Sequence, residues 1–335
     1  MQRQVVLLAN GLSACGHGVV VVVGGGEAVD GLASPEVQLI RLPEFRGRSG
    51  GLQFTVGLRQ LVRRLRPDVV HGHGLRLAIS LRLARRRATR VLVTSHGIDP
   101  VVVAKLRWPL RLTRVRVLAC GEAPQRLLAS IGISSTIVPV GIEAPPTAKT
   151  PEQLRARFQI RDGARIAVSA IRLSAQKDPE TMIRAVAKVN NLHLVLFGDG
   201  PLLEPTRMLA TSLGAAERIH FVGYDREARS WMPASEVVVL SSIWEGHVLV
   251  ALEAMAAGVP LVATACPGIA EWVENEHTAL LSPMRDAEAL AENLRRVLRS
   301  RDLAQRLIAQ GAELAMRHGA QKMVEAHLGV YGVSA

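Results

Sequence analysis

The sequence contains few cysteines and few aromatic residues. Its 335 residues include three cysteines, Cys15, Cys120 and Cys266, which lie far apart and not at the spacing of metal ligands. They exclude a disulfide framework and a cysteine-based zinc site, and they fit a reducing compartment. Aromatic residues make up 3% of the chain. Recognition of single-stranded nucleic acid depends on aromatic stacking, so no nucleic-acid partner is expected.

Long apolar runs and several well-known motifs are also absent from the sequence. No apolar run reaches the roughly 20 residues that a membrane span needs. The first ten residues lack the apolar core and cleavage site of a signal peptide. We therefore expect a cytoplasmic protein. No H-E-x-x-H, P-loop or Asp-x-Asp motif occurs, and no Ser-His-Asp or Cys-His set can be assembled with confidence.

Acidic residues are scarce in the first half of the chain. The whole sequence has a net charge of +12, and the excess of positive charge lies in that half. Residues 1–150 hold 21 Lys and Arg against 8 Asp and Glu, whereas residues 151–335 hold 20 against 21. This asymmetry suggests an anionic partner for the first half: a phosphate-bearing acceptor, an anionic membrane surface or nucleic acid. Residues 102–111 combine cations and apolar residues with Trp108. They fit a peripheral contact with the inner face of a membrane, or a surface helix or loop.

Short β-branched runs alternate with helical patterns along the chain, which is typical of parallel sheets covered on both faces. The first half predicts strands at 19–23, 37–41, 69–71, 91–95 and 115–119, with helices at 57–65 and 75–87. The second half predicts strands at 165–170, 192–197, 219–222, 237–240 and 261–263, with helices at 179–189, 201–213, 248–257 and 287–298. Two such series indicate an α/β protein with two doubly wound domains.

A proline-rich segment at 143–150 separates the two series. We place the domains at 1–145 and 146–335, with the last helix a candidate to pack back on the first domain. Ligands bind beyond the carboxyl ends of the strands in such folds, so the cleft between the two sheets is the expected site.

The opening segment fits either a strand or a helix. Too few residues separate it from the strand at 19–23 for a right-handed parallel crossover. A helix over 4–15 places Val5, Leu8 and Leu12 on one face, at the cost of Gly11 in its interior. The helix is the preferred interpretation, and no first strand then precedes it.

Two glutamates flank the start of the helix at 248–257. Glu245 lies in a turn after the strand at 237–240, and Glu253 lies eight residues further, about 12 Å along a helix axis. The N–H groups and dipole of a helix start suit a diphosphate. The two carboxylates fit two hydroxyl-bearing parts of one ligand, or a helix cap and a solvated helix residue.

Other polar residues follow other strands of the second half. Arg172 and Lys177 lie in a strand-to-helix loop, where two cations fit a departing diphosphate or ordinary surface charge. Gly198 begins a tight turn, and Tyr224 fits base stacking or packing under its loop. In the first half, His71, His73 and His96 each follow an apolar strand, and lone histidines are more often structural.

These motifs, in this order, resemble the retaining glycosyltransferases of family 4, which have the GT-B fold of two facing Rossmann-like domains. The resemblance covers nearly the whole chain. It rests mainly on Glu245-x7-Glu253 within residues 244–260, and also on Arg172-x4-Lys177 and Gly198-Asp-Gly-Pro201.

The resemblance implies transfer of a sugar from a nucleotide-diphosphate sugar to an acceptor, with retention of the anomeric configuration. Arg172 and Lys177 would bind the diphosphate, Glu253 the ribose and Glu245 the transferred sugar. The backbone at the helix start, which comprises Gly246, His247, Val248 and Leu249, would cradle sugar and phosphate, and His96 would reach the sugar from the first domain. The family needs no tightly bound cofactor or metal.

The sequence departs from the family pattern at three places. Ile171 and Asp178 stand where the family has glycine, and the family opens with a strand and a glycine-rich loop ahead of its first helix. The acceptor remains open, including an anionic or lipid-linked one. Alternative functions are a GT-B phosphorylase or sugar-nucleotide epimerase, or a non-catalytic basic module that binds a membrane or nucleic acid.

Overall fold

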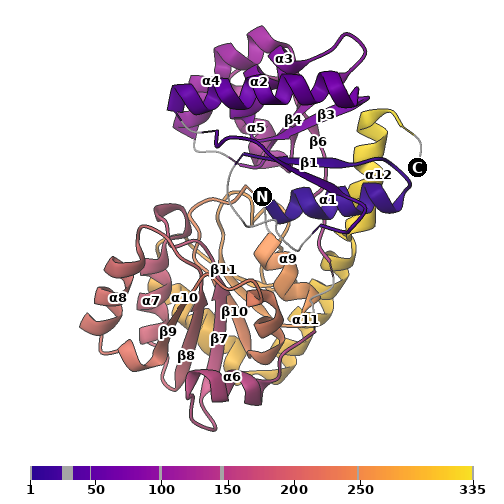
Figure 1. Ribbon diagram of the computed structural model, residues 1–335. Coiled ribbons are helices and arrows are strands. Elements are labelled where there is room, and N and C mark those ends of the chain that lie inside the picture. The colour runs from indigo at the N-terminus through magenta and orange to yellow at the C-terminus, as the bar shows by residue number, and fades with distance from the viewer. Residues whose placement is uncertain are drawn as a thin grey trace. The chain divides into compact units, whose positions relative to one another are not determined.

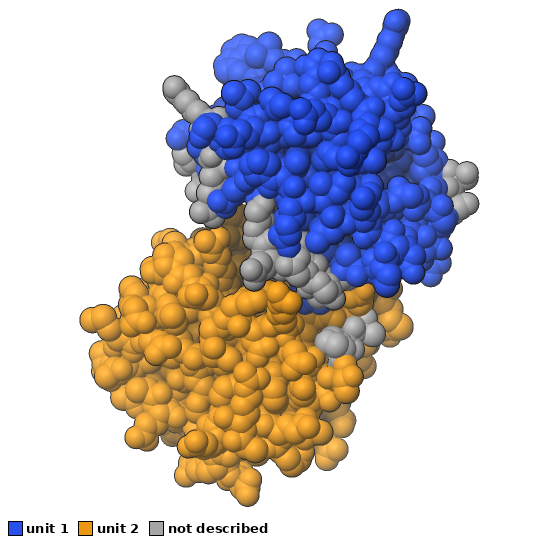
Figure 2. Space-filling model, in the orientation of Figure 1, with its two compact units in different colours: residues 1–141, 319–335 blue, residues 142–318 orange. Residues whose placement is uncertain are grey.

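Parallel strands and flanking helices make up both halves of the protein, as a computed structural model shows (Figure 1). The structure describes residues 2–24, 33–45, 47–97, 100–143, 147–246 and 249–333. The chain divides into two units (Figure 2). Unit 1 comprises Met1–Gly141 and Gly319–Ala335, and unit 2 comprises Ile142–His318. Unit 1 is therefore built from both ends of the chain.

Unit 2 contains one parallel six-stranded sheet in the order β12-β11-β10-β7-β8-β9. Its strands are β7 (Arg165–Ala170), β8 (Leu192–Phe197), β9 (Ile219–Gly223), β10 (Val237–Leu240), β11 (Leu261–Thr264) and β12 (Leu280–Ser282). All four residues of β10 are buried, as expected of a strand covered on both faces. The chain adds strands outward from β7 in one direction and from β10 in the other. The order therefore reverses between β7 and β10, which is where such folds bind ligands.

Four of the six α-helices described in unit 2 begin at residues whose side chains accept hydrogen bonds from free N–H groups. The six helices are α6 (Pro151–Phe158), α7 (Pro179–Ala187), α8 (Leu203–Ser212), α9 (Leu249–Ala256), α10 (Ala287–Arg299) and α11 (Arg301–Met316). Thr150 and Gln153 form a capping box at α6, and Asp286 and Ser300 cap α10 and α11. Helix α7 packs with α8 and α10, and α9 packs with α11.

Unit 1 contains two parallel sheets among its described residues. One pairs β1 (Val20–Val23) with β2 (Gln38–Arg41), and the other has the order β3-β4-β5-β6. Its strands are β3 (Val69–His73), β4 (Arg90–Ser95), β5 (Arg116–Ala119) and β6 (Thr136–Ile137). The helices are α1 (Gln2–Ala14), α2 (Gly47–Leu65), α3 (Ala78–Ala84), α4 (Pro100–Thr113), α5 (Glu122–Ser130) and α12 (Ala320–Tyr331).

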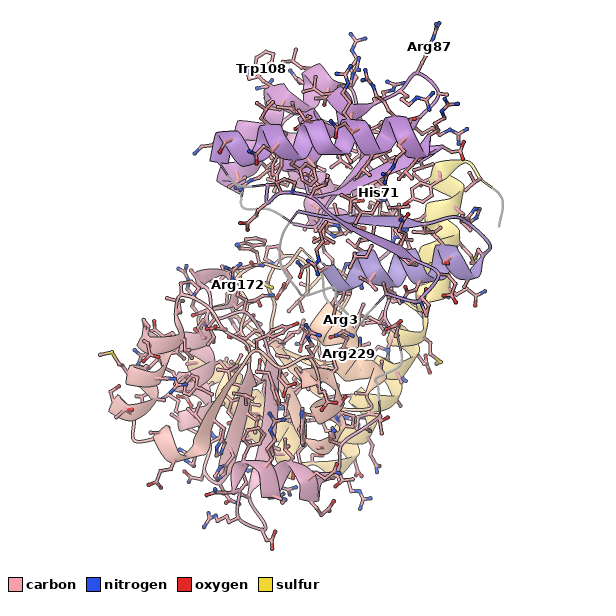
Figure 3. The ribbon with its side chains drawn as sticks, in the orientation of Figure 1. Arg3, His71, Arg87, Trp108, Arg172 and Arg229 are labelled. Carbon is pink, nitrogen blue, oxygen red and sulfur yellow. The ribbon has the colours of Figure 1, made fainter. Side chains whose placement is uncertain are left out.

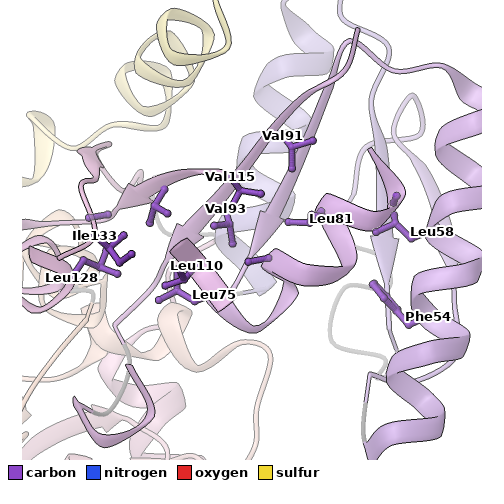
Figure 4. Close-up of a cluster of buried hydrophobic side chains, with 14 of the residues drawn as sticks. Phe54, Leu58, Leu75, Leu81, Val91, Val93, Leu110, Val115, Leu128 and Ile133 are labelled. Atoms are coloured by element: carbon purple, nitrogen blue, oxygen red, sulfur yellow. The ribbon is translucent and has the colours of Figure 1, made fainter. Parts of the chain in front are cut away.

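Apolar side chains cover the four-stranded sheet of unit 1 with two separate clusters. The larger one joins Phe54 and Leu58 of α2 to Leu81 of α3 and to Val93 of β4 (Figure 4). A second cluster joins Leu92 of β4, Leu118 of β5 and Tyr331 of α12. Since side chains alternate along a strand, Leu92 and Val93 point to opposite faces. The returning helix α12 therefore covers the face that α2 and α3 leave open.

The opening segment is a helix, as preferred from the sequence, and it packs on α12. Leu7 and Leu8 of α1 contact Val324 and Leu328 of α12. Gly11 is at the closest point, because a Cβ there would overlap Cγ2 of Val324. Gln4 is buried and bonds twice to Gly141, donating through Nε2 to its carbonyl at 2.6 Å and accepting its N–H at 3.1 Å.

Several expected helices differ in their bounds. Helix α2 starts ten residues before the expected start at 57. The helix expected at 75–87 consists of a 3-10 turn, Leu75–Leu77, followed by α3, which ends at Ala84. The segment 102–111 is helical and belongs to α4, despite Pro109 in its interior. No helix among the described residues is long and apolar enough to span a membrane.

Candidate active site

The candidate site in unit 2 lies at the carboxyl ends of β7 and β10, where the strand order reverses. The loop after β7 carries Arg172 and Lys177, and the loop after β10 carries Glu245. These loops are bonded together, since the N–H of Ile243 donates to the carbonyl of Gln176 at 2.8 Å. The amide of Gln176 donates in turn to the carbonyl of Trp244 at 3.0 Å. Two motifs about 70 positions apart therefore form one surface.

Lys177 and Glu245 are in direct contact. Nζ of Lys177 lies 2.5 Å from Oε1 and 2.6 Å from Oε2 of Glu245, and both side chains are largely buried. The hydroxyl of Ser242 donates to Oε1 at 2.5 Å. Ser242 was not among the residues predicted from the sequence. Its position three residues before Glu245, in the same turn, could have indicated this contact. The carboxylate is thus held by a cation and a hydroxyl at the strand ends.

The backbone around Glu245 is fixed by a close approach of a third loop. The N–H of Glu245 donates to the carbonyl of Pro267 at 2.8 Å. Gly268 follows with a φ of 95°, and a Cβ there would overlap the carbonyl oxygen of Glu245. Beneath the pair, burial and the charge of Glu245 raise the pKa of the Cys266 thiol to about 12. Cys266 is therefore a neutral thiol at physiological pH and no candidate nucleophile.

Asp178 has a structural role at the position where the family has glycine. Its φ of 43° and ψ of 58° lie in the left-handed region, which glycine adopts more easily than other residues. Its carboxylate caps α7, accepting from the hydroxyl of Thr181 at 2.6 Å and more weakly from its N–H. The negative charge is thus engaged at a helix start, where the dipole stabilises it.

Gly198 joins the loops after β7 and β8. Its N–H donates to the carbonyl of Gly223 at 2.7 Å, and the N–H of Ile171 donates to the carbonyl of Phe197 at 3.0 Å. Gly198 has a φ of 127°, and a Cβ there would overlap the carbonyl of Ile171. The tight turn expected at Gly198 therefore holds the loop that carries Arg172 against the next strand.

Glu253 lies on α9 and is paired with a residue that the sequence did not single out. Nη1 of Arg229 lies 3.3 Å from Oε1 of Glu253, and the side chains are 8% and 14% exposed. Arg229 belongs to the 3-10 segment η4 (Ala228–Ala234). Glu253 is therefore not the solvated helix residue that was one of its two interpretations. A buried arginine in a short irregular helix leaves no periodic signal in the sequence.

The remaining donor-side residues are more open. Arg172 is exposed, and its side chain has no hydrogen bond or ion pair with the residues that the structure describes (Figure 3). Tyr224 follows β9 and is 68% exposed, so it does not pack under its loop. Gly246 and Leu249 are half-buried, and Leu249 begins α9. His247 and Val248 lie outside the described residues.

His96 lies in unit 1, at the carboxyl end of β4, within a group of histidines. Nε2 of His96 is 2.8 Å from Nδ1 of His73. His71 is 2.6 Å from the hydroxyl of Tyr331 through Nδ1 and 2.6 Å from that of Thr94 through Nε2. Burial lowers the pKa of His73 to about 3 and holds the pKa of His71 well below its usual range. These rings are therefore neutral at physiological pH, each with one N–H to donate.

Groups of three or more His, Cys, Asp or Glu able to hold a metal ion do not occur among the described residues. The histidine group belongs to unit 1 and the Lys177–Glu245 pair to unit 2. Within unit 2 the structure brings Lys177 and Glu245 together, as the sequence motifs require.

Solved structures share the two-unit fold. The crystal structure of Anabaena HepE in complex with UDP and glucose has a TM-score of 0.85 at 19% identity, covering 99% of this chain and 95% of that one. It defines the fold as GT-B. Among sequences, EpsD of Bacillus subtilis is 26% identical over 302 residues, covering 82% of this chain and 78% of that protein.

Family profiles and one further relative establish the class. The profile described as Glycosyltransferase Family 4 matches residues 1–144, and the profile described as Glycosyl transferases group 1 matches residues 151–314. The lipopolysaccharide core biosynthesis glycosyltransferase LpsD of Rhizobium meliloti is 32% identical over 283 residues, covering 76% of this chain and 81% of that protein. The chain therefore belongs to the glycosyltransferases that these two profiles describe.

Proposed function

We propose that this glycosyltransferase takes its sugar from a nucleoside-diphosphate sugar and transfers it with retention of the anomeric configuration. The observation that carries the proposal is the contact of Lys177 with Glu245 where the strand order of unit 2 reverses. In the reaction, the bond from the anomeric carbon to the diphosphate breaks, and the acceptor hydroxyl attacks from the same face. The acceptor proton passes to the departing diphosphate.

Lys177 and Arg172 are proposed to stabilise the leaving diphosphate. Departure places extra negative charge on the phosphate oxygens, and preorganised cations lower the free energy of that charged state. Lys177 is held by Glu245 and by the backbone of its own loop, since the hydroxyl of Ser241 donates to its carbonyl at 2.8 Å. Exposed Arg172 provides a planar donor set that suits two phosphate oxygens. The start of α9 adds the positive end of a helix dipole.

Glu245 and Glu253 are proposed to bind hydroxyl groups of the sugar and of the ribose. A carboxylate has about four acceptor positions, so the contacts of Glu245 with Lys177 and Ser242 leave capacity for a sugar hydroxyl. Arg229 orients Glu253 in the same way. Tyr224 offers an exposed ring for the base, while Gly198, Gly246, His247, Val248 and Leu249 supply backbone close to sugar and phosphate.

His96 is proposed to contact the transferred sugar from unit 1. Its bond with His73 fixes the ring, and the low pKa of His73 keeps that partner neutral. An imidazole ring can donate an N–H to a sugar hydroxyl or accept from one through a ring nitrogen, and this is the chemistry proposed for His96. We propose further that transfer needs no tightly bound cofactor or metal ion.

The acceptor is proposed to be anionic or lipid-linked, at the cytoplasmic face of a membrane. The name of the LpsD relative refers to lipopolysaccharide core biosynthesis. On α4, Trp108 (Figure 3) and Leu112 are 66% and 78% exposed, and on α3, Ile79 and Leu83 are 48% and 54% exposed. Cations flank these apolar side chains, as on surfaces that bind anionic membranes. Co-sedimentation with vesicles should rise with anionic lipid content; indifference to that content would exclude the membrane contact.

The test of the function is a transfer assay with the full chain. A panel of UDP- and GDP-sugars is incubated with candidate acceptors, and release of nucleoside diphosphate is followed. Release that requires an acceptor supports transfer, and the anomeric coupling constant of the product by NMR reports retention. Sugar phosphate formed with inorganic phosphate would indicate a phosphorylase, and an altered free nucleotide sugar an epimerase. Lys177→Met should abolish the release, whereas exposed Lys188, at the C-cap of α7, provides the matched control, Lys188→Met.

A further inference from the structure

Unit 1 contains a pocket of about 290 Å³ that is lined by five arginines. Arg82 and Arg85 come from the end of α3, Arg90 starts β4, and Arg114 and Arg116 lie at the start of β5. The pocket therefore lies at the amino ends of β4 and β5. His96 lies at the carboxyl end of β4, so the pocket and His96 lie at opposite ends of this strand.

Two of the five arginines are held in place by the end of α12. Nη1 of Arg116 donates to the carbonyl of Val330 at 3.0 Å. Nη1 of Arg90 donates to the carbonyl of Tyr331 and, at 3.1 Å, to that of Gly332. The last carbonyls of a helix carry partial negative charge, which stabilises cations there. These contacts fix the two guanidinium groups without neutralising them.

The other three arginines have no such partner. Arg82, Arg85 and Arg114 are exposed, and none has a side-chain hydrogen bond or ion pair within the described part of the chain. No acidic side chain lines the pocket. Between Arg76 and Arg116 the sequence contains eleven Lys and Arg but one acidic residue, Asp99, which the structure does not describe. Like charges gathered in this way repel one another unless an anion lies between them.

We propose that this pocket binds a phosphate-bearing ligand. Guanidinium groups present paired N–H donors that match phosphate oxygens, and five of them around one small pocket suit a phosphomonoester or diphosphate group. Val91, Val115 and Val330 form an apolar part of the wall, against which the uncharged part of the ligand packs. The volume fits one small group and not a nucleic-acid strand. The ligand comes either from solution or from the headgroup of an anionic lipid.

The first arm of the test measures binding of a soluble ligand. Sodium tripolyphosphate is titrated into the full-length protein by calorimetry at fixed ionic strength. The triple variant Arg82→Gln, Arg85→Gln, Arg114→Gln should weaken binding at least about tenfold, because each charge-assisted bond contributes about that factor or more. The control is Arg59→Gln, Arg63→Gln, Arg64→Gln on α2, which removes the same charge from three exposed arginines outside the pocket. It should keep nearly the wild-type affinity.

The second arm uses vesicles of phosphatidylcholine with or without phosphatidylglycerol. The phosphate belongs to a lipid headgroup if the pocket variant alone loses vesicle binding and the wild type does not bind tripolyphosphate. Tripolyphosphate binding lost in the pocket variant alone assigns it to a soluble ligand. Equal losses in both triple variants, or a wild type that binds neither probe, would overturn the proposal. Circular dichroism confirms that each variant is folded. None of these outcomes depends on the transfer assay, because the pocket does not include the donor-site residues.

Discussion

At the carboxyl ends of its strands, unit 2 carries ion pairs, whereas unit 1 carries histidines that bond to one another. Lys177 is paired with Glu245 and Arg229 with Glu253, all largely buried. In unit 1, His73 is bonded to His96, and burial keeps His71 and His73 neutral. The carboxyl ends of parallel strands thus carry charged side chains in unit 2 and neutral hydrogen-bond donors and acceptors in unit 1.

The difference shows that the side chains at the strand ends determine which ligand groups each unit can stabilise. In the proposed reaction a departing diphosphate needs stabilising charge, and cations held by carboxylates in unit 2 would provide it. Neutral imidazoles provide hydrogen bonds without charge, which suits uncharged hydroxyl groups. The unmatched cations of unit 1 lie instead at the opposite edge of its sheet, around the arginine pocket. Four predictions test this comparison.

The largest effect is expected from Glu245→Gln in unit 2. The amide keeps the shape of the side chain but removes the charge that holds Lys177 in place. Turnover should fall by about 10²–10³-fold, the range found when one preorganised electrostatic group is removed. His96→Asn in unit 1 should cost less, because it removes one hydrogen-bonding group and leaves the buried ion pairs of unit 2 intact. Steady-state release of nucleoside diphosphate measures both variants.

Glu152→Gln, in the exposed first turn of α6, is the control for the loss of one carboxylate. It should leave turnover unchanged. A Glu245→Gln variant that turns over at the wild-type rate would remove the Lys177–Glu245 pair from the mechanism.

Arg229→Met is expected to have the largest effect on stability. It removes the cation from a carboxylate that is 14% exposed, and breaking a buried ion pair in this way costs about 3–5 kcal/mol. Urea unfolding, followed by the fluorescence of the tryptophans, measures the change. The double variant Arg229→Met, Glu253→Met should recover much of the loss, because neither charge then remains buried. No recovery in the double variant would mean that Arg229 acts through packing alone.

Acid should destabilise both units, and unit 1 more than unit 2. In unit 2, burial lowers the pKa of His193 to about 4 and also lowers the pKa of His220, but three histidines of unit 1 are more deeply buried. The pKa of His73 is about 3 in the folded protein and about 6.5 in the unfolded chain. Above about pH 6.5 the ring is mostly neutral in both the folded and the unfolded protein, so His73 does not reduce stability there. As the pH falls from there towards 3, the unfolded chain binds a proton that the folded protein does not, so stability is lost. Buried His71 and His327 shift in the same direction, and Tyr331 stays neutral throughout because burial raises its pKa.

Between pH 7.5 and 5.5, His73 alone should account for a loss of about 1 kcal/mol. Unfolding curves at the two pH values measure the loss, and His73→Gln should reduce it. Hydrogen exchange resolved by peptide assigns the loss to a unit. A pH response of equal size in unit 2 would contradict the contrast between the two strand edges.

The smallest expected effect concerns the contact between α1 and α12 in unit 1. Alanine usually stabilises a helix by about 1 kcal/mol relative to glycine, but the Cβ of Gly11→Ala would overlap Val324. We therefore expect a loss of about 1 kcal/mol, typical of overpacking. In a Val324→Ala background the same substitution should stabilise the protein. Thermal unfolding of the four variants tests whether the sign reverses.

The sequence predicts unit 2 better than unit 1 for identifiable reasons. Strands β7, β8 and β10 have the expected bounds because each is an apolar run buried on both faces. In unit 1, Gly47, Gly50 and Gly51 suggest a loop, yet helix α2 includes them. Packing of Phe54 and Leu58 on the core outweighs the low helix propensity of the three glycines. Strand β6, with two residues, is too short to leave a pattern.

The candidate site was predictable where its residues follow strands and not where they depend on tertiary contacts. Lys177 and Glu245 both follow parallel strands, and strand order then brings them together. Arg229 belongs to an irregular helix, so its contact with Glu253 depends on how η4 packs against α9. Tyr331 lies 260 positions from His71, and no local pattern predicts that bond.

The return of α12 to unit 1 has a consequence for the order of folding during synthesis. Unit 2 is continuous in sequence, so all of it has been synthesised before Gly319 is added. Unit 1 must wait for α12 to cover Leu92 and Leu118 and to bond with His71. Its sheet therefore keeps one apolar face uncovered while an entire second unit is translated. A released chain that ends at His318 should thus expose apolar surface and recruit chaperones, although all of unit 2 is present.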